Sequence, residues 1–188
     1  MSDFLSFDTL SLHAGQTLDS EFGSRAQPIH QTTSYVFTDT DTASSLFNLE
    51  RGGHVYNRIS NPTVGVLEQR VAALEGGSAS VCVSSGMSAV FCALTALVSQ
   101  GDHVVASANM YGGNISLLKN TLPRFGITAT FVDPTDIKQI ESAIQENTKI
   151  IFGELIGNPG LSVMDIEAVS KICSKHHLPL MIDGTFNT

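Results

Sequence analysis

Short apolar runs alternate with helical patterns after residue 62, and this alternation limits the possible folds most strongly. Strands are expected at residues 80–83, 103–107, 128–132, 150–154 and 178–182. Helices are expected before and between them, at residues 63–74, 88–98, 114–122, 134–145 and 166–176. Strands separated by helices are typical of α/β proteins with a parallel, doubly wound sheet.

The first 62 residues lack this periodicity and contain many turn formers, such as Gly23, Pro28 and Gly52–Gly53. One short helix is expected over about residues 41–49, with Asp39 or Thr40 near its cap. We therefore interpret residues 1–62 as an extended N-terminal arm that wraps other structure, such as another subunit. Residues 63–188 are interpreted as the α/β domain.

Composition excludes several classes of function. The net charge of −8 argues against non-specific binding to nucleic acid or to an anionic membrane. The most apolar stretch, Met87–Val98, is too short to cross a bilayer, and no targeting segment is recognisable at the start of the chain. Scattered cysteines (Cys82, Cys92 and Cys173) indicate reduced thiols in the cytoplasm, and the histidines lack metal-ligand spacing.

Asp183 directly follows the last apolar run, Leu178–Ile182. Open α/β sheets bind ligands beyond the carboxyl ends of their strands, so this carboxylate is expected to face a ligand crevice. A carboxylate close to an apolar core is costly unless it pairs with a cation. The position therefore favours a partner with positive charge.

A second group of residues, Ser85, Gly86 and Met87, lies between an expected strand and an expected helix. Free N–H groups and the positive end of the helix dipole make such a turn a seat for phosphate. A plain strand–helix turn is equally compatible with these residues. The sequence contains neither a G-x-G-x-x-G fingerprint nor a P-loop, which disfavours dinucleotide and P-loop functions.

Other candidates have ordinary alternatives as well. Tyr111 follows a strand and precedes two glycines, so its ring is suited either to stacking on a planar ligand or to covering a turn. Glu154 ends a strand, and the amide of Asn158 is suited to a ligand oxygen or to turn formation. Tyr56 and Arg58 offer donors for a phosphate, or simply precede a helix.

Several of these candidates are expected to gather beyond the carboxyl ends of the strands. A phosphate seat, a stacking ring and a carboxylate together suit a phosphorylated, aromatic, cationic cofactor. Pyridoxal 5′-phosphate meets all three requirements, because its ring nitrogen needs an acidic partner to remain protonated. No metal site is expected.

At this point the chain resembles the pyridoxal-phosphate enzymes of cysteine and methionine metabolism. The resemblance extends from about residue 12 to residue 186 and implies the large domain of PLP fold type I, the aspartate-aminotransferase-like fold. It rests on Tyr56-x-Arg58-x-x-Asn61-Pro62-Thr63, Ser84-Ser85-Gly86-Met87, Tyr111-Gly112, Asn158-Pro159 and Asp183-x-Thr185-Phe186.

The resemblance also implies a role for each candidate residue. Gly86 and Met87, with Ser85 beside them, would hold the cofactor phosphate through backbone N–H groups. Tyr111 would stack on the pyridine ring and assist proton transfer as a catalytic residue, and Asp183 would pair with the ring nitrogen. The remaining roles fall to Asn158 near the 3′-oxygen, Glu154 in support of the site, and Tyr56 and Arg58 at the phosphate of a neighbouring subunit's cofactor.

Within the family, the motifs are most similar to O-acetylhomoserine sulfhydrylases. That resemblance implies γ-replacement, in which sulfide or methanethiol displaces acetate from O-acetylhomoserine to give homocysteine or methionine. It also implies a homo-oligomer, a dimer of dimers, in the cytoplasm. Activities like those of cystathionine γ-synthase or methionine γ-lyase are the alternatives within the family, and a non-catalytic remnant is the alternative outside it.

The family's Schiff-base lysine follows the aspartate-bearing strand in a Ser-x-Thr-Lys segment, and no lysine of this sequence matches it. We therefore expect an incomplete domain and an inactive, aggregation-prone fragment. The family's sheet resembles the strand order 3-2-4-5-6-7-1. Without strands 6 and 7, the strand at residues 80–83 would lack a neighbour, and the phosphate seat would be displaced from Asp183.

Overall fold

A computed structural model describes residues 5–187 of the chain. Its contacts divide it into two units, of which the first ends at Cys82 and the second begins at Val83. The helices of the first unit are α1 (Phe7–His13), α2 (Thr40–Phe47) and α3 (Pro62–Leu74). The second unit contains α4 (Gly86–Leu97), β1 (His103–Ser107), α5 (Gly112–Ser116), the π-helix η1 (Leu117–Thr121), the 3-10 helix η2 (Leu122–Phe125), β2 (Thr128–Val132), α6 (Ile137–Ser142), β3 (Thr148–Glu154), α7 (Ile166–His176) and β4 (Leu180–Asp183).

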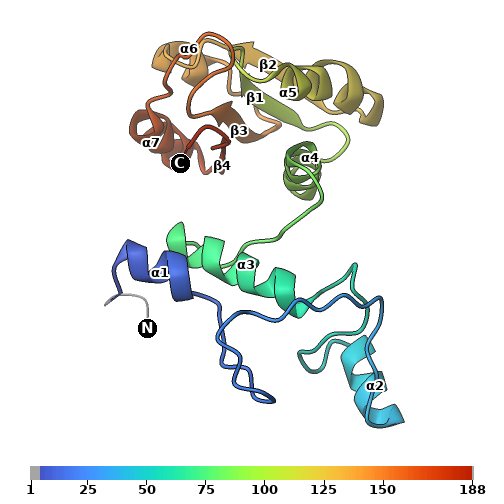
Figure 1. Cartoon of the computed structure of the whole chain (residues 1–188). Coiled ribbons are helices and arrows are strands. Elements are labelled where there is room, and N and C mark those ends of the chain that lie inside the picture. The colour runs from blue at the N-terminus through green and yellow to red at the C-terminus, as the bar shows by residue number, and fades with distance from the viewer. Residues whose placement is uncertain (1–4, 188) are drawn as a thin grey trace. The chain divides into compact units, whose positions relative to one another are not determined.

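The four strands of the second unit form a parallel sheet in the order β2-β1-β3-β4 (Figure 1). This confirms the expected α/β class and the first part of the expected strand order, since these are the strands expected as 3-2-4-5. β3 and β4 pair with Glu154 opposite Asp183. The register therefore brings two carboxylates to the same edge of the sheet.

Apolar side chains cover both faces of this sheet. One cluster joins Val90 and Leu94 of α4 to Ile150 and Phe152 of β3, and it includes the apolar side of η1. The other cluster joins Ile151 to α6 and α7. Figure 1 shows α6 and α7 on the opposite side of the strands from α4 and α5. Burial on both faces explains why the central strands β1 and β3 are largely apolar without alternation.

Residues 80–83 do not form the expected strand, and this prediction is wrong. A strand needs a neighbour for its backbone groups, and this segment instead bonds to α3. The N–H of Cys82 donates to Oε1 of Glu68 at 2.9 Å, and the hydroxyl of Ser80 donates to the carbonyl of Glu68 at 2.6 Å. Val81 is 80% exposed, so the segment has no sheet to pack against.

Two expected helices are also altered. The helix expected at 114–122 is divided into α5, η1 and η2. The helix expected at 134–145 shortens to α6, because Asp133 Oδ1 accepts from the N–H of Thr135 at 2.9 Å and holds a turn there. Asp136 then caps α6 by accepting from the N–H groups of Lys138 and Gln139, each at 3.0 Å.

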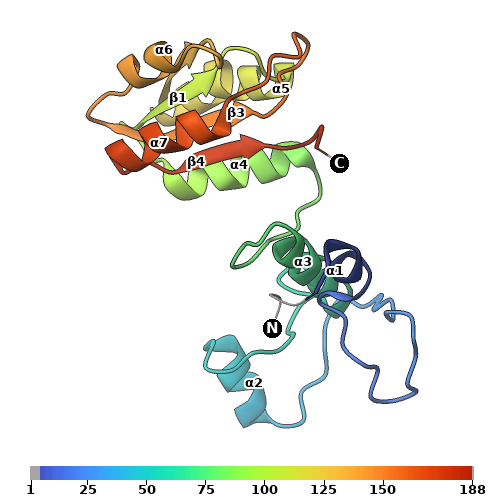
Figure 2. The ribbon, with the colours of Figure 1, turned by 90° about the vertical axis from the view of Figure 1, so that its left-hand side faces the viewer.

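In the first unit, α1 was not expected, whereas α2 begins beside Asp39, which caps it as expected. Figures 1 and 2 show α1 beside α3. Arg70 Nε donates to the carbonyl of Ala14 at 2.9 Å, and a Cβ at Gly15 would lie 2.6 Å from a backbone oxygen of α3. Gly15 therefore permits this close approach. The division into a 1–62 arm and a 63–188 domain stays a prediction.

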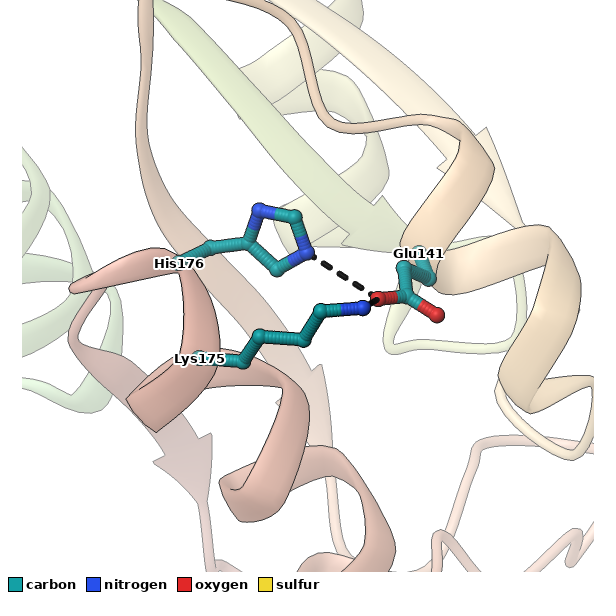
Figure 3. Close-up of polar contacts among 3 residues, drawn as sticks. All are labelled: Glu141, Lys175 and His176. Carbon is teal, nitrogen blue, oxygen red and sulfur yellow. Dashed lines mark hydrogen bonds and ion pairs between the residues drawn. The ribbon is translucent and has the colours of Figure 1, made fainter.

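A polar link joins the two helices on one face of the sheet. Lys175 Nζ and His176 Nε2 of α7 lie 2.7 Å and 3.0 Å from Oε1 of Glu141 in α6 (Figure 3). Hydrogen bonds from Lys175, and then from His176, lower the pKa of the Glu141 carboxyl. The link lies at the surface, so we expect it to fix the packing of α6 on α7 only weakly. Within residues 5–187, none of the helices combines the length and hydrophobicity that a membrane span needs.

Candidate functional site

A cavity of about 440 Å³ opens beyond the carboxyl ends of β3 and β4, within the second unit. Its walls come from the start of α4, the start of α5 and the segments that follow β3 and β4. The lining residues are Ser85, Gly86, Met87, Val90, Tyr111, Asn114, Glu154, Ile156, Asn158, Asp183, Thr185 and Phe186. This is the edge at which parallel α/β sheets bind ligands.

The N-terminus of α4 forms one side of the cavity. Ser85 caps the helix, because its Oγ accepts from the N–H of Ser88 at 3.1 Å. The N–H groups of Gly86 and Met87 belong to the first turn, where an α-helix provides no acceptor. A Cβ at Gly86 would meet no atom within 4 Å, so packing within the chain does not require a glycine there. The bare backbone is instead open to an anion.

Tyr111 lies at the start of α5, with about half of its surface exposed. Its N–H donates to Oε1 of Glu154 at 2.6 Å, which fixes the backbone from which the ring projects. A Cβ at Gly113 would overlap Cε1 of Tyr111 and would lie 3.0 Å from the sulfur of Met87. The glycine therefore leaves the space that the ring occupies. The ring remains available to a planar ligand in the cavity.

Two carboxylates stand side by side at the sheet edge. Glu154 is buried, and its oxygens accept from the N–H of Tyr111 at 2.6 Å and from the N–H of Asn158 at 3.2 Å. Asp183 is half-buried, and its Oδ1 accepts from the N–H and hydroxyl of Thr185 at 3.0 Å and 2.5 Å. Within residues 5–187 neither carboxylate forms an ion pair. Asp183 is therefore open to a cation from a ligand.

The structure brings most of the expected site residues together. Ser85, Gly86, Met87, Tyr111, Glu154, Asn158 and Asp183 all line the cavity. The expectation that the phosphate seat would be displaced from Asp183 is therefore wrong. Core packing of Val90 and Leu94 against the sheet places α4, and a strand at 80–83 is not needed for this.

Tyr56 and Arg58 belong to the first unit. The guanidinium carbon of Arg58 lies 5.6 Å from the centre of the Tyr56 ring, a cation–π contact. Their expected role at a neighbouring subunit's phosphate stays a prediction, as do the binding roles of the residues that line the cavity.

Asn114 lies among the expected residues but was not predicted from the sequence. Its side chain is 1% exposed, and its Nδ2 donates to Oε1 of Glu154 and to Oδ2 of Asp183, each at 3.1 Å. The one local signal was a polar residue at the start of a helix, directly after Tyr111-Gly112-Gly113. Its partners lie 40 and 69 residues away, so local patterns did not reveal it.

Comparison with known proteins gives a consistent result. Residues 8–188 match the model of the family described as Cys/Met metabolism PLP-dependent enzyme. A homocysteine synthase of Schizosaccharomyces pombe is 48% identical over 96% of the chain and 42% of its own length. An O-acetyl-L-homoserine sulfhydrylase of Leptospira meyeri is 47% identical over 95% of the chain and 40% of its own length. The chain thus spans about two fifths of the length of these relatives.

Solved structures agree with this match. A candidate O-acetylhomoserine (thiol)-lyase of Campylobacter jejuni, which contains N'-pyridoxyl-lysine-5'-monophosphate, superposes with a TM-score of 0.92 at 42% identity. The match covers 96% of this chain and 44% of that one. A cystathionine γ-lyase of Lactobacillus plantarum gives a TM-score of 0.88 at 33% identity, over 98% and 46% of the two chains. The chain therefore belongs to the Cys/Met metabolism family of PLP-dependent enzymes.

Proposed function

We propose that the protein binds pyridoxal 5′-phosphate in the cavity and acts as an O-acetylhomoserine sulfhydrylase. The observation that carries this proposal is the arrangement of three elements around one cavity: the free N-terminus of α4, the exposed ring of Tyr111 and the carboxylate of Asp183. The similarity to sulfhydrylases and homocysteine synthases supports the choice of reaction.

The residues of the cavity suit this cofactor. A volume of about 440 Å³ falls within the range that small-molecule sites occupy. One wall carries backbone donors and the positive end of a helix dipole, which suits a phosphate. The other wall carries Asp183, which suits a protonated ring nitrogen. The backbone donors and the carboxylate that line the cavity thus match the two charged groups of the cofactor.

The residues around the phosphate and the ring would each bind the cofactor in a different way. The N–H groups of Gly86 and Met87 would donate to the phosphate, with the cap residue Ser85 beside them. The ring of Tyr111 would lie against the pyridine ring and exclude water from one face. Its hydroxyl would carry a proton to or from the substrate, which makes Tyr111 the proposed catalytic residue.

Asp183 would accept a hydrogen bond from the ring nitrogen and keep that nitrogen protonated. The side-chain amide of Asn158 would donate to the 3′-oxygen. Glu154 would act through Tyr111 and Asn158, because its oxygens accept from the backbone N–H groups of both residues. It would hold both of those residues in place. When bound, the cofactor supplies an electron sink for carbanions at the substrate.

In the proposed reaction, the bond between Cγ and oxygen of O-acetylhomoserine breaks and acetate leaves. The sulfur of hydrogen sulfide then bonds to Cγ, and its proton balances the charge of the departing acetate. The product is homocysteine, or methionine when methanethiol replaces sulfide. Because acetate is the leaving group, the reaction needs no oxidant or reductant.

Parts of the proposal concern groups outside the cavity. Within residues 5–187 the lining contains no lysine, and the Schiff-base lysine that the family resemblance implies would hold the cofactor covalently. Tyr56 and Arg58 would reach the phosphate in a neighbouring subunit of a homo-oligomer, a dimer of dimers. A cytoplasmic location is consistent with the free thiols of Cys82, Cys92 and Cys173.

The direct test supplies the purified full-length protein and pyridoxal phosphate with O-acetylhomoserine and sulfide. Homocysteine and acetate should appear in equal amounts, and omission of either substrate should abolish homocysteine. Cystathionine from O-acetylhomoserine and cysteine, without homocysteine from sulfide, would indicate a cystathionine γ-synthase instead. Absence of any product despite bound cofactor would contradict the enzymatic proposal.

A second candidate, methionine γ-lyase activity, is favoured by one comparison. An L-methionine gamma-lyase of Fusobacterium nucleatum is 40% identical over 96% of the chain and 46% of its own length. The same assay with methionine as the only substrate distinguishes this candidate, because a lyase would release methanethiol and a 2-oxo acid. The proposed sulfhydrylase should consume methionine far more slowly than O-acetylhomoserine.

A further inference from the structure

Asn114 connects the two carboxylates of the cavity through a single amide group. We propose that Asn114 is a positioning residue that turns Asp183 toward the ring nitrogen of the cofactor and leaves Glu154 to hold the backbone. This inference rests on the proposed function and adds to it a residue through which Asp183 acts. Asn114 itself would not contact the cofactor's ring nitrogen.

The geometry suits an amide and few other groups. Pairing of β3 with β4 places Glu154 opposite Asp183, so two like charges meet at one edge of the sheet. The NH₂ group of Asn114 has two hydrogens, and its nitrogen lies 3.1 Å from an oxygen of each carboxylate. One hydrogen is thus available to each. The amide thereby reduces the repulsion between the two carboxylates and sets the direction in which each one points.

The orientation of the amide is fixed by this pair of bonds. Its oxygen, Oδ1, is buried and has no hydrogen-bond partner within residues 5–187. Rotation of the amide by half a turn would place that oxygen against Glu154 and Asp183, where it would be repelled. The chain therefore leaves one polar atom of Asn114 without a partner and keeps the two donors directed at the carboxylates. A residue that only filled space would not need this arrangement.

The remaining contacts give the two carboxylates different tasks. Glu154 accepts from the backbone of Tyr111 and Asn158 on its two oxygens. Asp183 accepts from Thr185 on Oδ1, while Oδ2 accepts only from Asn114 within the described part of the chain. A carboxylate oxygen has room for about two hydrogen bonds. Oδ2 of Asp183 and Oε2 of Glu154 can thus each accept one more, but Glu154 is buried, whereas Asp183 is half-buried where it lines the cavity.

The test measures how strongly Asn114 is coupled to the ring nitrogen of the cofactor. Binding of pyridoxal phosphate and of deazapyridoxal phosphate, in which carbon replaces the ring nitrogen, is measured by equilibrium dialysis with the full-length protein. The two compounds share the phosphate and the aldehyde. The ratio of their dissociation constants therefore isolates the contact between Asp183 and the ring nitrogen.

In the unchanged protein, we expect pyridoxal phosphate to bind at least about tenfold more tightly than the deaza compound, since hydrogen bonds to charged groups carry that much free energy. The change N114L keeps the approximate volume and removes both donors. We expect it to reduce this ratio to below about threefold. A purely structural defect would weaken the binding of both compounds equally and leave the ratio of their dissociation constants unchanged. That result would overturn the inference.

A second variant keeps the test decisive if N114L does not fold. N114T retains a single hydroxyl hydrogen, which can serve only one carboxylate at a time. We expect an intermediate ratio, and a ratio equal to that of the unchanged protein would overturn the inference. The matched control is N120L, because Asn120 is an exposed asparagine that bonds to Ser116 outside the cavity. Its ratio should not change.

The outcomes separate this inference from the proposed function. If the unchanged protein binds neither compound, or binds both equally, the proposed role of Asp183 at the ring nitrogen fails, and the inference that depends on it fails too. If the unchanged protein discriminates and both Asn114 variants discriminate equally well, only the inference fails.

Discussion

The sheet has a buried polar cluster at each end, and the two clusters are built differently. At the amino end, His103 is 1% exposed, and its ring nitrogens lie 2.8 Å from the hydroxyl of Thr148 and 2.9 Å from that of Thr130. At the carboxyl end, Asn114 is equally buried but bonds to two carboxylates that both line a cavity, the buried Glu154 and the half-buried Asp183. The polar groups at the amino end bond to one another, whereas the carboxyl end keeps a carboxylate oxygen that is available to a ligand in the cavity.

This difference separates stability from function. A closed cluster contributes to folding, because removal of one member leaves the others buried without partners. An open cluster contributes less to folding, because one of its acceptors has no partner within the protein and remains available to a ligand. Substitutions at the amino end should therefore lower stability and leave cofactor affinity unchanged. Substitutions at the carboxyl end should lower cofactor affinity and leave stability nearly unchanged.

The largest effect is expected for D183A, because it removes the one carboxylate proposed to contact the cofactor. We expect the rate of homocysteine formation to fall by about a hundredfold or more, since a preorganised electrostatic group contributes that much in a dry site. The melting temperature without cofactor should remain close to that of the unchanged protein. A variant with full activity would show that the open end is not the site.

The opposite pattern is expected for H103L at the closed end. Loss of the ring removes a hydrogen-bond partner from the hydroxyls of Thr130 and Thr148, of which Thr148 still accepts from the N–H of Gln145 at 2.8 Å. The free energy of unfolding should therefore fall by about 2 kcal/mol. Denaturant titration of the protein without cofactor measures this loss. The affinity of the folded variant for pyridoxal phosphate should match that of the unchanged protein, and a specific loss of affinity at preserved stability would break the comparison.

A smaller effect on function is expected for G113A. The added methyl group would overlap the ring of Tyr111, so the ring must move from its place at the cavity. We expect activity to fall by about tenfold, in proportion to a modest misplacement of a catalytic group. The matched control is G112A, because a Cβ at Gly112 would meet nothing within 4 Å. Equal losses in the two variants would argue against a specific effect on Tyr111.

Stability should also depend on pH through His103. Burial lowers the pKa of this histidine from its ordinary value of 6.5, so the unfolded chain binds the proton more readily than the folded one. The contribution to stability is complete above pH 6.5 and is lost as the pH falls from there toward the lower pKa of the folded state. The slope in this window is at most about 1.4 kcal/mol per pH unit.

Denaturant titrations between pH 5 and 8 measure this slope. Replacement of the exposed His30 by Gln provides the control, since this variant should keep the acid-dependent loss. In H103Q, much of the acid-dependent loss of stability should disappear. If the two variants show the same pH dependence, another group causes the loss.

The smallest effect is expected for E141Q, which removes the surface link between α6 and α7. Both partners of Glu141 are at least partly exposed, and surface ion pairs contribute little. We expect the melting temperature to change by no more than about 2 °C. The difference should diminish further as the salt concentration increases, because the charges are screened.

Local patterns predicted the parts of the fold that depend on local packing. The strands 103–107 and 128–132 and the helix 166–176 agree with the structure because each is a clear apolar run or a clear helical stripe. The failure at residues 80–83 has a different origin. A strand exists only when another strand pairs with it, and this segment lacks such a neighbour in the sheet, as the expected strand order implied.

The site shows the same limit. Ser85, Tyr111, Glu154 and Asp183 end or follow expected strands, so the rule that ligands bind at the carboxyl edge was sufficient to group them. That rule does not predict the position of Asn114, which lies within a helix. Its proposed role depends on two side chains that are distant in sequence, and only the three-dimensional arrangement reveals that they share its amide.

The protonation state of the cofactor's ring nitrogen tests the central claim most directly. Pyridoxal phosphate labelled with ¹⁵N in the ring is bound to the full-length protein and to D183N, and the nitrogen chemical shift is measured at neutral pH. We predict the shift of a protonated pyridinium in the unchanged protein and of a neutral pyridine in D183N. The same shift in both proteins would contradict the assignment of Asp183 to the open end of the sheet as the partner of the cofactor.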